Sequence, residues 1–366
     1  MIERIHETMR RAVGEGVFPG AVLWVSVRGS TVVHESFGRA SLRPDAVPAT
    51  RDTVYDLASL TKAIVATTCI AILTGRSRLS LDRPVAKIIP AFRGPGKETI
   101  TLAQVLNHAS GLPAWRPLFE GIDPSEVGTT AGKSRILESV CREPLVYPAG
   151  TKSVYSDIGF ILLGHLLEIF TGVSLDDLAR QWICEALGMK DTFFLPLGSE
   201  SRTREIGRRL IASTEDCPWR GKVLHGVVHD ENAYAMGGVA GHAGLFGTAG
   251  DVGRFALTLL DALEGRSDFI PAETLRVFTA RSDRTPGSSW ALGWDTPSPP
   301  SSSGRYFSPD AFGHLGYTGT SLWIDPEKKL IVVLLSNRVH PTSRNDKIKA
   351  FRPLIHDQIV EELGLC

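Results

Sequence analysis

A serine and a lysine three residues apart are the first pair in the chain whose types and spacing suit chemistry. They stand at Ser59 and Lys62, in the segment SLTK. On a helix this spacing places two side chains one turn apart, so the lysine amine reaches the serine hydroxyl. A hydroxyl is a poor nucleophile until a neighbour manages its proton. The pair therefore indicates acyl transfer through Ser59, with Lys62 as its activating neighbour.

The residues that follow Ser59 predict a helix that begins at this serine. Apolar or small residues recur there at the offsets of one helical face: Leu60, Ala63, Ile64, Thr67, Ile70 and Ala71. A helix start offers unpaired N–H groups and the positive end of the helix dipole. Both favour a developing oxyanion and lower the proton affinity of a nearby ammonium.

Two later segments strengthen a signal that is weak when it stands alone. Tyr155-Ser156-Asp157 lies just before an apolar helical stripe, and His314-Leu315-Gly316 lies just before a predicted strand pair. Taken singly, Tyr155 is equally well explained by packing against the following helix, and His314 by burial at a strand start. The presence of all three segments in one chain favours a catalytic set.

The elements that position these residues follow from periodicity and turn signals. Helices are predicted over 2–13, 251–263 and 353–363, and strands over 20–27, 31–37, 321–324 and 330–335. Helical signals dominate 102–170, where Thr101 and Gln104 form a capping box. Pro353 suits the first position of the last helix. These elements predict one sheet with an inserted helical region.

The motifs and their order resemble the serine β-lactamase and penicillin-binding-protein superfamily. The likeness is to the branch with class C β-lactamases, D,D-carboxypeptidases, D-aminopeptidases and family VIII esterases. That family uses Ser-x-x-Lys, Tyr-x-Asn and Lys/His-x-Gly. Context of the same kind surrounds the motifs over 55–62 (YDLASLTK), 106–113 (LNHASGLP) and 313–325 (GHLGYTGTSLWID). The likeness covers nearly the whole chain.

The resemblance implies a fold class and a domain organisation. The expected class is α/β (α+β), β-lactamase/transpeptidase-like, with an antiparallel sheet flanked by N- and C-terminal helices plus a mostly helical lobe. We expect one catalytic domain over 1–366, with an α/β lobe at about 1–58 and 225–366 and a helical lobe at about 59–224.

The resemblance also implies roles for particular residues. Ser59 is the acylated nucleophile, Lys62 activates it, and Tyr155 is a base that then protonates the leaving group. The backbone N–H groups of Ser59 and Tyr317 form the oxyanion hole. Asp157, His314, Gly316 and Tyr317 are the expected substrate-binding residues. Which of Lys62 and Tyr155 accepts the proton first stays open, because relatives differ.

Two residues depart from the β-lactamase pattern. Asp157 stands where β-lactamases usually have Asn, and an acid there either pairs with Lys62 or meets a substrate ammonium. His314 replaces the lysine of most β-lactamases, which predicts a conditional positive charge near neutral pH. Both departures weaken an assignment as a true β-lactamase.

A further block shows a narrower resemblance to putative penicillin-binding proteins and muropeptide amidases. It comprises 228–233 (VHDENA) and 237–246 (GGVAGHAGLF). His229, Asp230 and His242 either line the cleft or anchor loops beside close-packed glycines, and loop anchors are favoured. A metal site built from them and His108 lacks helix-spaced or Cys/His ligand pairs. No metal and no cofactor are therefore expected.

Composition limits the remaining function classes. Lys plus Arg equals Asp plus Glu at 40 each, so nucleic acid and membrane surfaces are not expected partners. The 5 cysteines form no C-x-x-C pair and are expected to be free. The N-terminus lacks the apolar run of a signal, which predicts a cytoplasmic protein. The oligomeric state is not predicted.

The favoured function is hydrolysis of small esters or amides through an acyl-enzyme, with an esterase-like preference. The alternatives are a D,D-peptidase or amidase on cell-wall muropeptides, or a β-lactamase. A non-catalytic penicillin-binding module is disfavoured, because Ser59, Lys62 and Tyr155 are all present.

Overall fold

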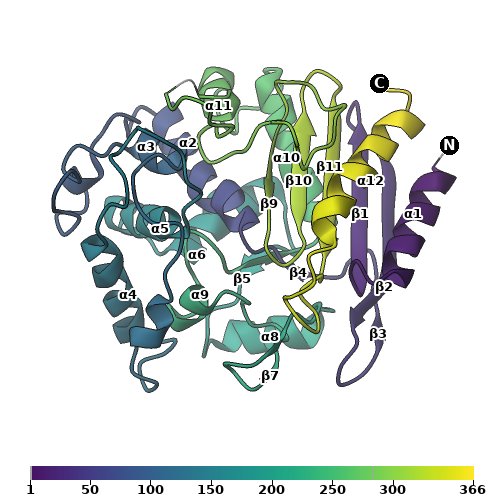
Figure 1. The fold of residues 1–366 in the computed structure, drawn as a ribbon, viewed down its shortest axis with the longest axis horizontal. Helices are drawn as coiled ribbons and strands as arrows, with labels where there is room; N and C mark the ends of the chain where they lie inside the picture. The colour runs from purple at the N-terminus through teal and green to yellow at the C-terminus, as the bar shows by residue number, and fades with distance from the viewer. Residues whose placement is uncertain (1, 283) are drawn as a thin grey trace.

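A six-stranded antiparallel sheet organises the computed structural model, which describes residues 2–282 and 284–366 (Figure 1). Its strand order is β3-β2-β1-β11-β10-β9, so strands from both ends of the chain pair at its centre. Trp24 of β1 faces Val333 of β11 on one side and His34 of β2 on the other. The strand bounds are β1 Gly20–Val27, β2 Ser30–Ser41, β3 Val47–Pro48, β9 Phe312–Leu315, β10 Ser321–Asp325 and β11 Leu330–Ser336.

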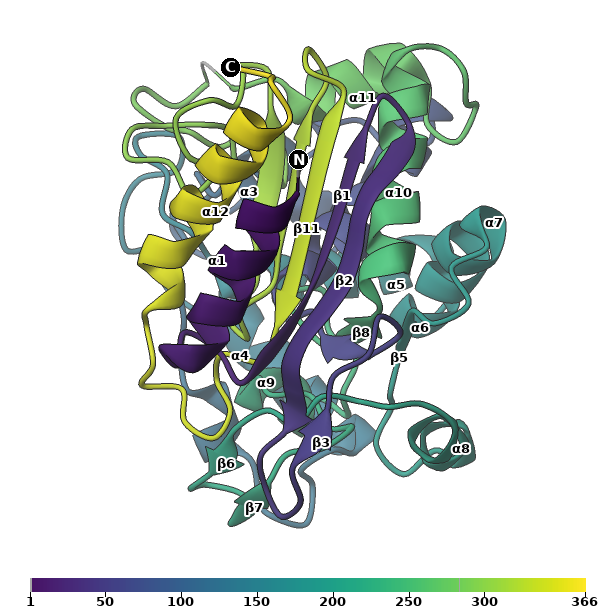
Figure 2. The same cartoon turned by 90° about the vertical axis from the view of Figure 1, so that its right-hand side faces the viewer.

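Helices cover both faces of this sheet. Figure 2 shows α1 (Glu3–Gly14) and α12 (Ile348–Glu362) side by side on one face, and α10 (Ala249–Leu263) packs on the other. Alternate residues of β1 therefore enter two separate cores: Leu23 packs toward α1 and α12, and Trp24 packs toward α10. Gly253 of α10 lies so close to the Trp24 ring that an added Cβ would come within 2.7 Å of it. The strand is buried on both faces for this reason.

The other elements lie outside this sheet and the three helices that cover it. The longer ones are α2 Thr68–Gly75, α4 Thr130–Arg142, α5 Asp157–Thr171, α8 Glu200–Arg208 and α11 Ala272–Thr279. The shorter helices are α3 Leu102–Leu106, α6 Leu175–Ala179, α7 Glu185–Leu187, α9 Glu231–Ala235, η1 Lys62–Thr67, η2 Val85–Lys87, η3 Leu118–Gly121 and η4 Arg180–Cys184. The minor strands are β4 Tyr55–Asp56, β5 Phe193–Phe194, β6 Asp216–Cys217, β7 Lys222–Val223 and β8 Leu245–Gly247.

Most predicted elements are confirmed, including both terminal helices, the 321–335 hairpin and the capping box of Thr101 and Gln104. Two boundaries are wrong. The strand predicted over 31–37 continues to Ser41 in β2. The last helix begins at Ile348, so Pro353 lies inside it instead of at its first position. Among the described residues no single helix has the length and apolar character to cross a membrane, although the bent pair Asp157–Thr171 and Leu175–Leu187 meets that test by length and composition.

Candidate active site

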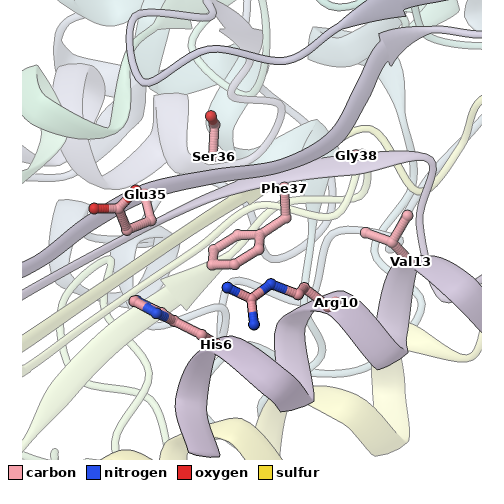
Figure 3. Close-up of a pocket in the computed structure, with 7 residues that line it drawn as sticks. All are labelled: His6, Arg10, Val13, Glu35, Ser36, Phe37 and Gly38. Carbon is pink, nitrogen blue, oxygen red and sulfur yellow. The ribbon is translucent and has the colours of Figure 1, made fainter. Parts of the chain in front are cut away.

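A cavity of about 820 Å³ collects the predicted site residues from three distant segments. Its lining includes Ser59, Tyr155, Asp157, His314, Gly316 and Tyr317. Lys62 lies directly behind Ser59 and is fully buried. A smaller cavity of about 430 Å³, between α1 and β2, contains none of the predicted site residues (Figure 3).

The backbone before Ser59 turns sharply to present this residue. Ala58 adopts a positive φ of 48°, a left-handed conformation that costs a residue with a side chain about 1–3 kcal/mol. The Asp56 carboxylate holds the turn by accepting the Ala58 N–H at 2.9 Å. Ser59 is half-buried, and a helical segment follows it directly. The predicted position of Ser59 at a helix start is therefore confirmed.

The helix after Ser59 begins as a π-helix, a detail that the sequence did not predict. The π-helical stretch is η1, and α2 continues it without a break. The Thr68 hydroxyl donates to the Ala63 carbonyl at 2.9 Å and so satisfies an acceptor within the widened turn. Such stretches occur frequently at functional sites.

Lys62 sits between the nucleophile and an acid. Its Nζ lies 2.8 Å from Ser59 Oγ, 2.7 Å from Asp157 Oδ1 and 3.1 Å from the His242 carbonyl oxygen. Burial alone would lower the Lys62 pKa, but the negative charge of Asp157 and contact with Tyr155 outweigh it and raise this pKa. Lys62 is therefore a cation at neutral pH. Of the two partners left open for Asp157, the structure favours Lys62.

The start of α5 fixes Asp157 and Tyr155. Ser156 is the N-cap, and its hydroxyl accepts the Gly159 N–H at 3.0 Å. Asp157 thus occupies the first helical turn, where the helix dipole stabilises a carboxylate. The Tyr155 ring lies 4.7 Å from the His108 ring and 5.4 Å from the Trp290 ring, measured between centres. Burial raises the pKa of the Tyr155 phenol although the Lys62 charge opposes this effect, so Tyr155 is neutral at rest.

His314 is a neutral side chain in this structure. Its Nδ1 lies 2.8 Å from the Leu315 carbonyl oxygen, which can only accept, so Nδ1 carries the proton. Burial, reinforced by the Lys62 charge, lowers the His314 pKa to about 3. The expectation of a charge that switches near neutral pH is therefore wrong. It failed because the sequence does not reveal that this side chain is only 1% exposed.

The two residues expected to supply the oxyanion-hole amides, Ser59 and Tyr317, both line the cavity. In the part of the chain that the structure describes, neither the Ser59 nor the Tyr317 amide donates a hydrogen bond. The segments that carry them are joined, because the Thr318 hydroxyl donates to the Asp56 carbonyl at 2.7 Å and the Thr320 hydroxyl to the Leu57 carbonyl at 3.0 Å. Both amides are thus left without a protein acceptor, and their use as an oxyanion hole stays a prediction.

The histidines of the second block both line the cavity and anchor loops. His229 Nε2 lies 3.1 Å from Glu215 Oε2, and His242 Nε2 lies 2.8 Å from Asp230 Oδ1. Asp230 also caps α9 by accepting the Ala233 N–H at 2.7 Å. The hydrogen bond and charge of His242 lower the Asp230 pKa against the opposing effect of burial. The two interpretations of this block are thus compatible.

His108 and Ser110 serve the loops around the site. His108 is buried, and its Nδ1 accepts the Ser156 N–H at 3.0 Å. Ser110 is buried outside the lining of the cavity, and its hydroxyl accepts the Leu112 N–H at 3.3 Å. Within residues 2–282 and 284–366 no group of three or more His, Cys, Asp or Glu side chains is placed to hold a metal ion.

Several cavity residues had no signal in the sequence. Trp115, Glu215, Trp290, Arg338 and Arg352 line the cavity, yet each stands alone in its segment without a recognisable spacing. Trp290 packs with its ring centre 4.4 Å from that of His108 and 5.7 Å from that of His314. Only the folded chain brings these residues together.

The comparisons with known proteins agree with this fold. A family model described as Beta-lactamase matches residues 5–355, and the chain belongs to this family. It is a serine hydrolase of that family, as the resemblance implied. The likeness in fold extends to a solved class C β-lactamase, with a TM-score of 0.74 at 20% identity over 98% of this chain and 96% of the other.

Two curated relatives are more similar in sequence. The chain is 34% identical to a putative D-alanyl-D-alanine carboxypeptidase of Escherichia coli, over 93% of this chain and 83% of that protein. It is 33% identical to an N-acetylmuramyl-L-alanine amidase of Bacillus subtilis, over 93% of this chain and 81% of that protein. Both relatives carry names from cell-wall chemistry.

Proposed function

We propose that this chain hydrolyses small esters or amides through an acyl-enzyme formed on Ser59. The observation that carries the proposal is the contact of 2.8 Å between Lys62 Nζ and Ser59 Oγ, inside a cavity that also contains Tyr155 and two unpartnered amides. A serine beside a charged lysine, facing preorganised N–H donors, is equipped for attack on a carbonyl carbon.

The proposed reaction has two halves. In the active form of the site Tyr155 has lost its phenolic proton to solvent while Lys62 stays charged. Ser59 Oγ then attacks the carbonyl carbon, its proton passes to the Tyr155 phenolate, and the amides of Ser59 and Tyr317 hold the oxyanion. Tyr155 then protonates the departing alcohol or amine, and the acyl group stays on Ser59. Water attacks the acyl-enzyme in the second half and gives a proton to Tyr155. The bond between Ser59 Oγ and the acyl carbon then breaks, Tyr155 returns the proton to Ser59 Oγ, and the acid leaves. The charge of Lys62, 4.9 Å from the centre of the Tyr155 ring, favours the phenolate during each transfer.

An esterase-like preference follows from the two departures from the β-lactamase pattern. Residue 157 is an aspartate, so it offers no side-chain amide to an acylamino group of the substrate. Its carboxylate is engaged by Lys62. His314 is neutral and offers no fixed charge for a carboxylate such as that of penicillins. Short activated esters need neither contact, because their carbonyl requires only Ser59 and the two amides.

A second candidate is peptidase or amidase action on cell-wall muropeptides. The relatives at 34% and 33% identity, with names from carboxypeptidase and amidase chemistry, favour this candidate. The proposed cytoplasmic location also suits this candidate, because its substrates would be recycled cell-wall fragments. A β-lactamase activity and a non-catalytic penicillin-binding module are the remaining alternatives.

Labelling and turnover test the central proposal. A fluorophosphonate probe should add one adduct to the wild-type protein in intact-mass spectra and none to Ser59→Ala. The matched control is Ser110→Ala, which should label normally because Ser110 lies outside the cavity lining. Turnover of an ester by Ser59→Ala at the wild-type rate would show that the proposal is wrong.

A substrate panel separates the candidates. Values of kcat/KM for p-nitrophenyl butyrate, nitrocefin, D-alanyl peptides and muropeptides should be highest for the ester. A higher value for nitrocefin would contradict the esterase preference, and muropeptides or D-alanyl peptides ahead of the ester would establish the cell-wall candidate instead.

A further inference from the structure

The loop Gly316–Thr320 carries the Tyr317 amide and is closed by its own hydrogen bonds. The Gly316 N–H donates to the Thr320 carbonyl at 2.7 Å, and the Gly319 N–H donates to the Gly316 carbonyl at 3.1 Å. The catalytic use of this amide is part of the proposed function, and the present inference rests on it.

Arg352 of α12 contacts the backbone of this loop. Its Nη2 donates to the Gly316 carbonyl at 3.1 Å and to the Thr320 carbonyl at 2.8 Å. The Gly316 carbonyl belongs to the same peptide unit as the Tyr317 N–H. In a planar trans peptide these two groups point in opposite directions. A donor that binds the Gly316 carbonyl therefore also fixes the direction of the Tyr317 N–H. It polarises the peptide unit as well, which makes that N–H a stronger hydrogen-bond donor.

Arg338 holds the next peptide unit of the loop. Its Nε donates to the Tyr317 carbonyl at 2.7 Å, and its guanidinium carbon lies 4.4 Å from the centre of the Tyr317 ring. Its Nη1 is fixed in turn by the carbonyls of Ser343, at 2.8 Å, and Asn345, at 2.7 Å. The two arginines thus clamp the peptide units on both sides of Tyr317.

Neither guanidinium has an acidic partner among the residues that the structure describes, although both line the cavity. The acids near them are engaged elsewhere: Glu215 binds His229 and Ser343, and Asp346 lies 3.6 Å from Lys349. Burial and the neighbouring Arg338 charge lower the Arg352 pKa to about 9, so Arg352 is still charged at neutral pH. Buried like charges without an acid are destabilising, so a structural role alone explains them poorly.

We infer that Arg352, assisted by Arg338, is a positioning residue that fixes and polarises the Tyr317 amide, so that the oxyanion is stabilised more than the bound substrate. Negative charge develops on the carbonyl oxygen only after Ser59 has attacked. The clamp therefore acts on the transition state and leaves ground-state binding nearly unchanged.

The test compares Arg352→Gln, Arg352→Lys and Arg338→Gln with wild type. The control is Arg276→Gln, because Arg276 also donates to a backbone carbonyl, that of Leu263 at 3.0 Å, but on α11 outside the cavity lining. The readouts are kcat and KM for p-nitrophenyl butyrate, and the Ki of phenylboronic acid, whose tetrahedral adduct on serine mimics the oxyanion. The midpoint of thermal unfolding, compared with the assay temperature, shows whether each variant is folded during the assay.

We expect Arg352→Gln to lower kcat and to raise the boronate Ki in parallel, each by about 10- to 100-fold, somewhat less than removal of an oxyanion donor outright. KM should change little. Arg352→Lys keeps a charged donor and should recover part of the loss, and Arg338→Gln should show a smaller effect of the same kind. Arg276→Gln should match wild type.

The inference is overturned if folded Arg352→Gln keeps its kcat, if only KM changes, or if activity falls no more than the folded fraction does. Should Arg352→Gln fail to fold, Arg352→Lys and Arg338→Gln decide by the same criteria. A failure of the proposed function is distinguishable, because it appears in the wild-type protein as absent acylation of Ser59, before any arginine is changed.

Discussion

Replacing Asp157 by Asn should destabilise the protein by unpairing a buried lysine. Lys62 Nζ and Asp157 Oδ1 are 2.7 Å apart, with side-chain exposures of 0% and 19%. At this separation the attraction between unit charges is about 6 kcal/mol for an effective dielectric constant near 20. Desolvation of both groups offsets part of it, and removing one partner of a buried pair typically costs about 3–5 kcal/mol. We expect a loss of about 3 kcal/mol in unfolding free energy at pH 7.

The loss should depend on pH in a definite direction. The pair raises the Lys62 pKa in the folded protein, so its contribution is complete below the unfolded pKa and is lost as pH rises through the folded pKa. In Asp157→Asn, burial without a partner makes the charged form of Lys62 unfavourable in the folded protein. This penalty disappears at high pH, where Lys62 is neutral in the folded and in the unfolded protein. The difference between wild type and variant should therefore be largest near pH 7 and should narrow above pH 10.

Urea denaturation at pH 7 and pH 10.5 measures both effects. The matched control is Glu168→Gln, because Lys133 Nζ and Glu168 Oε1 are also 2.7 Å apart but their side chains are 25% and 18% exposed. A partly solvated pair of this kind should contribute only about 1 kcal/mol or less. Equal small losses for both variants, or a difference that grows with pH, would refute the reasoning.

Three further predictions concern Lys62 and Tyr155, the neutral His314, and the expected independence from a metal. Lys62→Ala and Tyr155→Phe should each lower kcat/KM by about 10²-fold or more. Because both groups handle the same proton, the double variant should lose little beyond either single variant. Small, additive losses would indicate another base. Between pH 6.5 and 5 the unfolded chain binds a proton at His314, whereas the folded wild-type protein, in which the His314 pKa is lowered to about 3, does not. The unfolding free energy of wild type should therefore fall by about 1.6 kcal/mol more than that of His314→Gln over this range. EDTA should leave ester hydrolysis unchanged, and loss of activity that zinc restores would reopen the metal hypothesis for His229 and His242.

The features that the sequence predicted depend on local spacing. Ser59 and Lys62 are one turn apart on any helix, and the stripe after Tyr155 predicted α5, which begins at Asp157. The terminal helices and the central hairpin likewise follow from periodicity within single segments. The division into lobes, the catalytic roles and the cytoplasmic location stay predictions.

The features that escaped sequence analysis depend on contacts between distant segments. The charge of His314 is decided by burial and by Lys62, which lies 252 positions earlier in the chain (314 − 62). Arg352 meets the Gly316 carbonyl across 36 positions, and nothing in either segment indicates that contact. The start of α12 was missed because Pro353 resembles a helix start when only the residues after it are considered.

The charges around Ser59 give the proposed ester preference a physical basis in a chain that retains the family motifs. Lys62 is neutralised by Asp157, and the imidazole of His314 is kept neutral by burial. Positive charge without an acidic partner among the described residues is carried instead by Arg338 and Arg352, which donate to carbonyls of the loop that carries the Tyr317 amide. Charge in that position acts on the oxyanion of any acyl substrate, whereas charge at residue 314 would select substrates with a carboxylate. A site organised in this way should accept acyl groups by the fit of their carbonyl more than by their charge.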